Sequence, residues 1–214
     1  MSTMKAILDA IGQKSPGELF FPADFRPAGS EAAIKMALSR LVKEEKIKRI
    51  AHGIYYIPQY NTLIGDVLPP LDKVAQAIAD RDHVKIKPTG TFALNKLGLS
   101  TQVPMRQVYI TNGPPRSIKI GRSEIRFKTA SPRKLAMQGT FSSLLILALD
   151  ELGPNFIDEI MLNKIREVLL KEDTNILAED AKLAPAWIND LIYRVQKNKS
   201  LAMDNAASQI TNDR

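Results

Sequence analysis

The chain has 214 residues, 44% of them hydrophobic and 25% charged, a composition typical of a folded globular protein that excludes a mostly disordered one. It contains no cysteine, so a disulfide scaffold, a cysteine zinc site and thiolate catalysis are excluded. It has only two histidines, which leaves little for a histidine metal site or a Ser-His-Asp triad. No apolar run is long enough for a transmembrane helix, and the N-terminal stretch lacks the apolar core of a signal peptide. We therefore expect a cytoplasmic protein without a membrane partner.

The net charge of +7 is unevenly distributed along the chain. Residues 1–60 carry 9 basic and 6 acidic side chains, and residues 61–139 carry 13 basic and 5 acidic ones. Residues 140–214 reverse the sign, with 8 basic and 12 acidic side chains. A basic front and middle favour a polyanionic partner for the first two-thirds of the chain. Solvated surface charge without a partner would give the same distribution, so charge alone does not decide between the two.

The first 60 residues predict a winged helix-turn-helix domain. The expected elements are a helix over residues 2–12, a helical turn over 20–25, a helix over 30–45 and a β-hairpin over 46–57. Ser2 or Thr3 is a candidate N-cap of the first helix, and Ser30 precedes the longer one. Helix, short helix, helix and hairpin in this order is the layout of a winged helix-turn-helix.

The long helix over residues 30–45 has one face that suits DNA. Opposite its apolar stripe lie small, hydroxyl-bearing and cationic side chains; the small ones let a helix approach base edges, and cations at the margin reach phosphates. Candidate base-reading residues are Ser30, Ala32, Met36 and Ser39. Candidate phosphate contacts are Lys35, Arg40, Lys43, Lys48 and Arg49, with His52 at the hairpin turn as a weaker candidate. A winged-helix module that binds protein, with a merely solvated basic face, is the alternative.

Residues 61–139 predict a mixed α/β part that contains a strongly basic hairpin. The expected elements are a linker or crossing loop over 61–70, helices over 71–81 and 89–97, strands over 83–87 and 107–111, and a hairpin over 117–128. Alternation directs the apolar residues of this hairpin inward and its cations outward. The cations of this basic hairpin are Arg116, Lys119, Arg122, Arg126 and Lys128. They suit nucleic-acid phosphates or an acidic protein surface, although cations also keep an edge hairpin soluble.

Residues 140–198 predict a helical part packed on the middle domain. Apolar periodicity indicates helices over 141–152, 157–170, 176–183 and 185–195, with Trp187 as a packing anchor. Residues 199–214 are polar and without periodicity, and we expect them to form a flexible tail. The predicted fold class is α+β: a winged helix-turn-helix over residues 1–60, a basic α/β domain over 61–139 and a helical part over 140–198.

No constellation of residues predicts catalysis. Asp80, Asp82 and His83 lie together at a predicted helix end, where acids are usually a solvated cap. Glu124 and Lys128 are four residues apart, whereas nuclease sites usually place such a pair two apart on one strand face. We therefore expect no enzymatic activity, no cofactor and no metal ion.

Several stretches of the chain resemble the AbiEi-type antitoxins. Residues 30–41 (SEAAIKMALSRL) and 53–56 (GIYY) are similar to the N-terminal winged helix of this family. The more specific strings are residues 65–70 (GDVLPP), 88–104 (PTGTFALNKLGLSTQVP), 109–113 (YITNG), 118–121 (IKIG) and 125–128 (IRFK). They resemble a branch of the family from bacterial mobile elements that is defined only as a domain of unknown function. The resemblance covers about residues 5–195.

The resemblance implies the antitoxin half of a type IV toxin–antitoxin operon, a system of phage defence. Its winged helix would bind inverted repeats in its own promoter and repress the operon. The later domain would counter a nucleotidyltransferase toxin without forming a stable complex with it, and the basic hairpin is the best candidate for this antitoxin surface.

Two other functions remain as alternatives. One is a winged-helix transcription factor whose C-terminal part senses a ligand or dimerises, and the other is an RNA-processing or nuclease enzyme. A nucleotidyltransferase gene next to this one would favour the antitoxin over a plain transcription factor.

Overall fold

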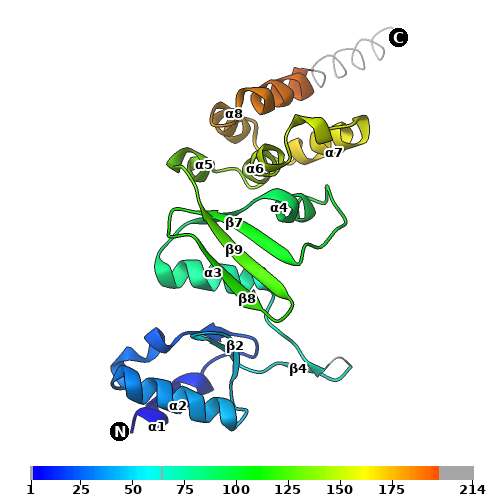
Figure 1. Cartoon of the computed structure of the whole chain (residues 1–214). Helices are drawn as coiled ribbons and strands as arrows, with labels where there is room; N and C mark the ends of the chain where they lie inside the picture. The colour runs from blue at the N-terminus through cyan, green and yellow to red at the C-terminus, as the bar shows by residue number, and fades with distance from the viewer. Residues whose placement is uncertain (1, 64, 198–214) are drawn as a thin grey trace, which may run out of the picture. The chain divides into compact units, whose positions relative to one another are not determined.

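The computed structural model describes residues 2–63 and 65–197 and has an α+β fold (Figure 1). The chain forms two compact units, of which the first contains residues up to 84 together with 117–125. The second contains residues 85–116 and the chain from residue 126 onward. These units have other boundaries than the parts expected from the sequence, and the expected tail over residues 199–214 lies outside the described residues. No described helix is long and apolar enough to cross a membrane.

The first unit begins with two helices joined by a short helical segment, as the sequence predicts. These elements are α1 (Thr3–Gly12), η1 (Pro22–Ala28) and α2 (Glu31–Lys43). The hydroxyl oxygens of Ser2 and Ser30 accept hydrogen bonds from the first-turn amides of α1 and α2, both at 3.3 Å. Each serine satisfies one backbone donor that a helix start leaves without an intrahelical partner, which fixes where the two helices begin.

The predicted hairpin is part of a three-stranded antiparallel sheet. Strands β2 (Lys48–Ala51) and β3 (Ile54–Tyr56) form the hairpin, and β1 (Leu19–Phe20) pairs with the other edge of β3. The sequence did not predict β1, because two residues carry no alternating pattern. The buried core between this sheet and the helices consists of Ile7, Ile11, Phe20, Phe25, Ile34, Ala37, Leu38, Leu41, Ile47 and Tyr55.

The segment expected as a linker contains a second, very short hairpin. Strands β4 (Tyr60–Asn61) and β5 (Gly65–Asp66) pair antiparallel. Helix α3 (Leu71–Asp82) follows, and His83 ends it in the left-handed conformation with φ of 55°. Because His83 serves as the helix end, the next strand begins at Ile86 rather than at residue 83.

The second unit contains most of a four-stranded sheet and one helix between its first two strands. These elements are β6 (Ile86–Pro88), α4 (Gly90–Lys96), β7 (Arg106–Thr111), β8 (Arg116–Ile120) and β9 (Ser123–Thr129). The strand order is β6-β7-β9-β8, and β6 runs antiparallel to β7. The β8–β9 hairpin is the basic hairpin of the sequence, and residues 117–125 at its tip belong to the first unit.

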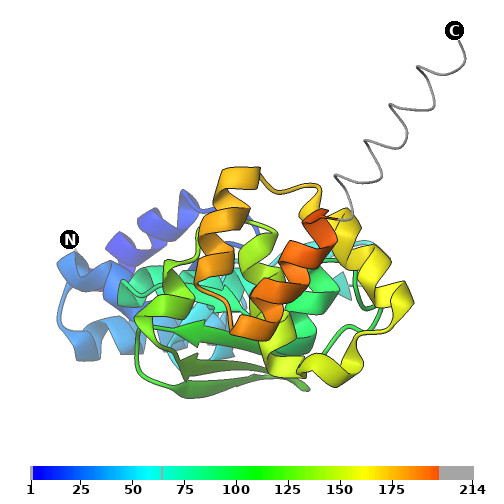
Figure 2. The same cartoon turned by 90° about the horizontal axis from the view of Figure 1, so that it is seen from above.

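A group of helices completes the second unit (Figure 2). They are α5 (Pro132–Ala136), α6 (Ser142–Leu152), η2 (Pro154–Phe156), α7 (Glu159–Leu169), α8 (Thr174–Lys182) and a helix over residues 186–197. Their core centres on α6, of which Leu145, Ile146 and Leu149 are at most 1% exposed. Trp187 is half-buried against this core, as the sequence predicts for a packing anchor. Helix α5 was not predicted, since five residues are too short for a helical period.

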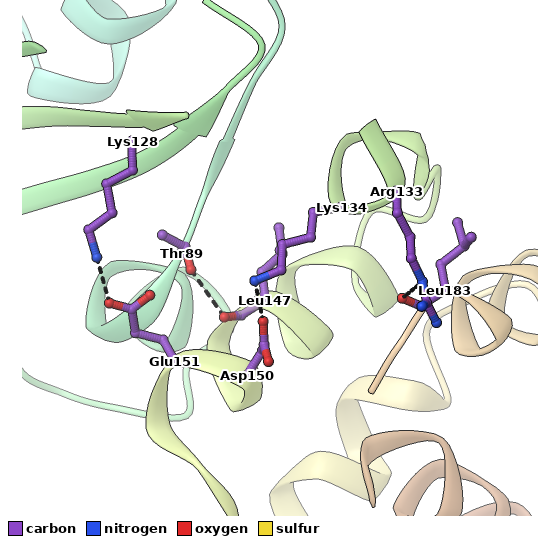
Figure 3. Close-up of polar contacts among 8 residues, drawn as sticks. All are labelled: Thr89, Lys128, Arg133, Lys134, Leu147, Asp150, Glu151 and Leu183. Carbon is purple, nitrogen blue, oxygen red and sulfur yellow. Dashed lines mark hydrogen bonds and ion pairs between the residues drawn. The ribbon is translucent and has the colours of Figure 1, made fainter. Parts of the chain in front are cut away.

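Polar contacts tie α6 to its surroundings in the second unit (Figure 3). The Thr89 hydroxyl donates to the carbonyl of Leu147 at 3.1 Å. Glu151 forms an ion pair with Lys128 of β9 at 2.8 Å, and Asp150 forms one with Lys134 of α5 at 2.5 Å. A strand, a short helix and the start of α4 are thereby fixed to one helix.

Two carboxylates cap the start of α6: Asp180 belongs to α8, and Glu172 lies in the turn that precedes α8. We call Ser142, Glu172 and Asp180 the carboxylate cluster. Asp180 is 2% exposed and accepts the backbone N–H groups of Gln138 and Gly139 at 2.8 and 2.9 Å. Glu172 Oε2 accepts the N–H of Ser142 at 2.9 Å. Asp180 also accepts the Ser142 hydroxyl at 2.6 Å. Negative groups at a helix N-terminus satisfy its unpaired amides and oppose its dipole, so we interpret this cluster as structural.

Candidate nucleic-acid interface

Helix α2 separates an apolar face from a polar one. Ile34, Ala37, Leu38 and Leu41 are buried in the core of the first unit. The residues proposed from the sequence to meet DNA on the opposite face are all exposed: Ser30, Ala32, Lys35, Met36, Ser39, Arg40 and Lys43. The packing of one stripe therefore turns the other stripe to solvent, where a partner can reach it.

The exposed face of α2 combines an apolar centre with cationic margins. Met36 is 56% exposed although its side chain is large and apolar, and its sulfur lies 3.7 Å from a guanidinium nitrogen of Arg40. Lys35 pairs with Glu31 at 2.5 Å, and this hydrogen bond holds the pKa of Glu31 below its ordinary value. Within the described part of the chain, Arg40 and Lys43 have no acidic partner. These two cations remain available for an external anion.

The β2–β3 turn holds Arg49 and His52 together. A guanidinium nitrogen of Arg49 lies 2.8 Å from His52 Nδ1, and its Nε donates to the carbonyl of Ala51 at 3.2 Å. Both side chains are exposed. The contact gives the long arginine side chain one fixed position at the hairpin turn, which lowers the entropy that it would lose on binding.

Lys48 differs from the other proposed phosphate contacts because it is half-buried and pairs with an acid of another hairpin. Its Nζ lies 2.7 Å from Asp66 Oδ2 and 5.5 Å from the centre of the Tyr60 ring, and the side chain is half-buried. The hydrogen bond from Lys48 lowers the pKa of Asp66, and the same bond raises the pKa of Lys48. Burial, together with Asp66, raises the pKa of Tyr56 to about 12. Lys48 thus fastens the β4–β5 hairpin, and this engagement makes it a weaker candidate for a phosphate contact than the exposed cations.

Three of the five predicted cations of the basic hairpin are exposed to solvent. Ile120, Ile125 and Phe127 are buried, so the expected alternation along the strands is confirmed. Lys119, Arg122 and Arg126 are exposed. The other two are engaged: Arg116 lies over the Phe127 ring at 5.2 Å, and Lys128 pairs with Glu151. Fewer cations of the basic hairpin are therefore available to a partner than the charge count of the sequence indicates.

A hollow in the first unit was not predicted from the sequence. It has a volume of about 650 Å³ and lies between η1, the start of α2, the β2–β3 turn and the end of α3. We call it the α2–α3 hollow; its lining includes Phe21, Arg26, Glu31, Lys35, His52 and Arg81. Arg26 and Arg81 are 55 residues apart in the chain and belong to different helices, so no local pattern could have placed them together.

The described residues contain no group of three histidine, aspartate or glutamate side chains that could hold a metal ion. Asp80, Asp82 and His83 lie at the end of α3, where Asp82 pairs with Arg81 at 2.7 Å and His83 ends the helix. The acids in this stretch have structural contacts within the helix end, and we assign them no chemistry.

The family model of DUF6088 matches residues 6–177, which is most of the chain. The chain therefore belongs to this family of unknown function. The matched residues include α2, the β2–β3 turn and the basic hairpin, so DUF6088 comprises both surfaces described above. No curated protein is significantly similar to the chain.

Proposed function

We propose that residues 2–57 are a winged helix-turn-helix that binds double-stranded DNA, with α2 as the recognition helix and the β2–β3 hairpin as the wing. The observation that carries the proposal is the polar face of α2, on which every residue proposed from the sequence is exposed. A helix of 13 residues with one free face fits the major groove, and a cationic hairpin beside it can follow the phosphate backbone.

The side chains on α2 divide into two roles. Met36, Ser39 and Ala32 occupy the middle of the exposed face and read base edges. The exposed thioether of Met36 suits an apolar contact with a thymine methyl group, and the Ser39 hydroxyl can bond to any base. The phosphate contacts are Lys35, Arg40, Lys43 and Arg49. Ser30 contributes mainly by capping the helix, since its hydroxyl already accepts an amide hydrogen bond.

As the biological role, we propose a cytoplasmic autorepressor that is also the antitoxin of a type IV toxin–antitoxin pair. The first unit would bind inverted repeats in its own promoter. The resemblance to AbiEi-type antitoxins supports this role, and the exposed cations Lys119, Arg122 and Arg126 offer a surface for it. The functional partner would be a nucleotidyltransferase toxin, and the effect would not require a stable complex with it.

The base-reading role of α2 is tested by Ser39→Leu. A bulky apolar side chain in the middle of the reading face should change sequence preference, at a cost of about 1–3 kcal/mol for each mismatched contact. The measurement compares binding to a duplex from the region upstream of the gene with binding to a scrambled duplex of the same base composition. Ser15→Leu is the matched control, because Ser15 is exposed and lies outside α2. Equal weakening on both duplexes would show that α2 does not read sequence.

The antitoxin role is tested by the triple variant Lys119→Gln, Arg122→Gln and Arg126→Gln. These side chains are exposed, so the variant should fold normally, lose protection against the induced toxin and still repress a promoter reporter. The matched control neutralises the exposed cations Lys73, Lys164 and Lys171. Full protection by the folded hairpin variant would mean that these cations only keep the hairpin soluble.

A further inference from the structure

The α2–α3 hollow gathers positive charge from three elements of the first unit. Its cations are Arg26 of η1, Lys35 of α2 and Arg81 at the end of α3, and His52 of the hairpin turn adds an imidazole ring. Two acids, Glu31 and Asp82, also line the hollow. Cations therefore exceed acids around a hollow of about 650 Å³, which is large enough for a phosphate group with its neighbouring sugar.

The two acids of the hollow pair with two of its three cations. Glu31 pairs with Lys35, and Asp82 pairs with Arg81 through Nε at 2.7 Å and through Nη2 at 3.2 Å. Arg26 is exposed and forms no ion pair with any acid in the described ranges. Its charge acts on Glu31 from a distance and contributes to lowering the pKa of that carboxyl, after the larger effect of Lys35.

Arg81 is held in a fixed orientation that suits recognition of an anion. Its guanidinium lies 4.6 Å from the centre of the Phe21 ring, and that ring is 5% exposed. Stacking on an aromatic ring and the bidentate bond to Asp82 together remove most of the side chain's freedom. The Nη1 edge of the guanidinium makes no hydrogen bond to the described residues. A preorganised planar donor of this kind is typical of phosphate recognition.

The hollow also admits the close approach of a ligand to the backbone. Gly53 adopts φ of 67° at the hairpin turn, and a Cβ added there would meet no atom within 4 Å. The first turn of α2 borders the same space through Glu31, and helix N-termini favour anions. The open backbone at Gly53 and the helix start add to the effect of the cations, on which the case for an anion site rests.

We propose that the α2–α3 hollow binds a phosphate group, and that on duplex DNA this group is a backbone phosphate. The DNA part of this inference rests on the proposed function. Lys35 and His52 belong both to the hollow and to the DNA-binding face, so a duplex lying along that face passes the mouth of the hollow. Arg81 then extends the DNA interface to α3, outside the 60-residue segment that the sequence indicated.

The test uses the full chain and the variants Arg26→Gln and Arg26→Gln/Arg81→Gln. In the DNA arm, binding to the upstream duplex is measured over a range of salt concentrations. Loss of one phosphate contact should reduce the slope of log affinity against log salt by about 0.9 and weaken binding to all sequences alike. The control is Lys5→Gln/Lys73→Gln, which removes two exposed cations outside the hollow. Arg26 is exposed, so its single variant keeps the test valid if loss of Arg81 disturbs Phe21.

A second arm separates the two sources of phosphate. Inorganic phosphate and ATP are titrated into the wild type, and the amide NMR signals of Gly29 and Gly53, which border the hollow, are followed. A reduced slope in the DNA arm without free-phosphate binding identifies a backbone phosphate. If the wild type binds phosphate or ATP and Arg26→Gln abolishes this binding, the ligand of the hollow is a free phosphate compound. This outcome holds even if the protein binds no DNA. If wild type and variants behave alike in both arms, the inference is overturned, whereas a wild type that fails to bind DNA contradicts the proposed function.

Discussion

The double variant Lys43→Gln/Arg49→Gln is expected to lose about tenfold or more in affinity for the upstream duplex, with a salt slope reduced by about 1.8. Lys43 lies in the last turn of α2 without an acidic partner in the described residues, and the exposed Arg49 is positioned by His52. Each substitution removes one phosphate contact. Neither side chain belongs to the core, so the folded structure should not change. Electrophoretic mobility shift or fluorescence anisotropy at several salt concentrations measures both quantities.

The Lys5→Gln/Lys73→Gln double variant is the control for this effect, since it lowers the net charge by the same amount elsewhere. Lys48→Gln offers a second comparison. Lys48 is bound to Asp66, so its loss should change the salt slope less than the loss of Lys43. A Lys43→Gln/Arg49→Gln variant with the affinity and slope of the wild type would rule out the assignment of these residues to DNA.

Gly139→Ala is expected to destabilise the second unit by about 3 kcal/mol or more. A Cβ at this position would overlap the Ser142 hydroxyl oxygen and lie 2.5 Å from Glu172 Oε2 and 2.8 Å from Asp180 Oδ2. To make room, the carboxylate cluster would have to move and leave buried amides without acceptors, and each such loss is costly. Urea unfolding followed by the fluorescence of Trp187, the only tryptophan of the chain, measures the change.

Gly12→Ala is the control for Gly139→Ala. A Cβ at Gly12 would meet no atom within 4 Å, and Gly12 is the last residue of α1. We expect its free energy of unfolding, followed by circular dichroism, to stay within about 0.5 kcal/mol of the wild type. Equal stability of Gly139→Ala and the wild type would contradict the packing of the carboxylate cluster around the turn before α6.

The local elements of the fold could be predicted from the sequence where a pattern spans enough residues. Ser2 and Ser30 mark the starts of α1 and α2, and alternation along β8 and β9 places Ile120 and Phe127 inside. Strands of two residues, such as β1 and β4, carry no period that distinguishes them from a loop. Their pairing depends on neighbours that only the folded chain supplies.

The sequence was enough to predict which face of α2 is exposed. It was not enough to predict which of the proposed cations are already paired within the protein. The apolar stripe of α2 determines which side faces solvent, and the prediction of its exposed residues follows directly from that. The partners of Lys48 and Lys128 lie 18 and 23 residues away, so their ion pairs could not be read from sequence spacing. For the same reason, the α2–α3 hollow and the contact of Arg81 with Phe21 required the structure.

The most direct test of the proposed DNA-binding face is a salt titration of DNA binding by the full chain. The duplex from the region upstream of the gene is compared with a scrambled duplex of the same composition. The base-reading residues of α2 predict tighter binding to the upstream duplex. The four phosphate contacts at Lys35, Arg40, Lys43 and Arg49 predict a contribution of about −3.6 to the slope of log affinity against log salt. Equal, salt-independent binding to both duplexes, or no binding at low salt, would contradict the assignment of this face to DNA.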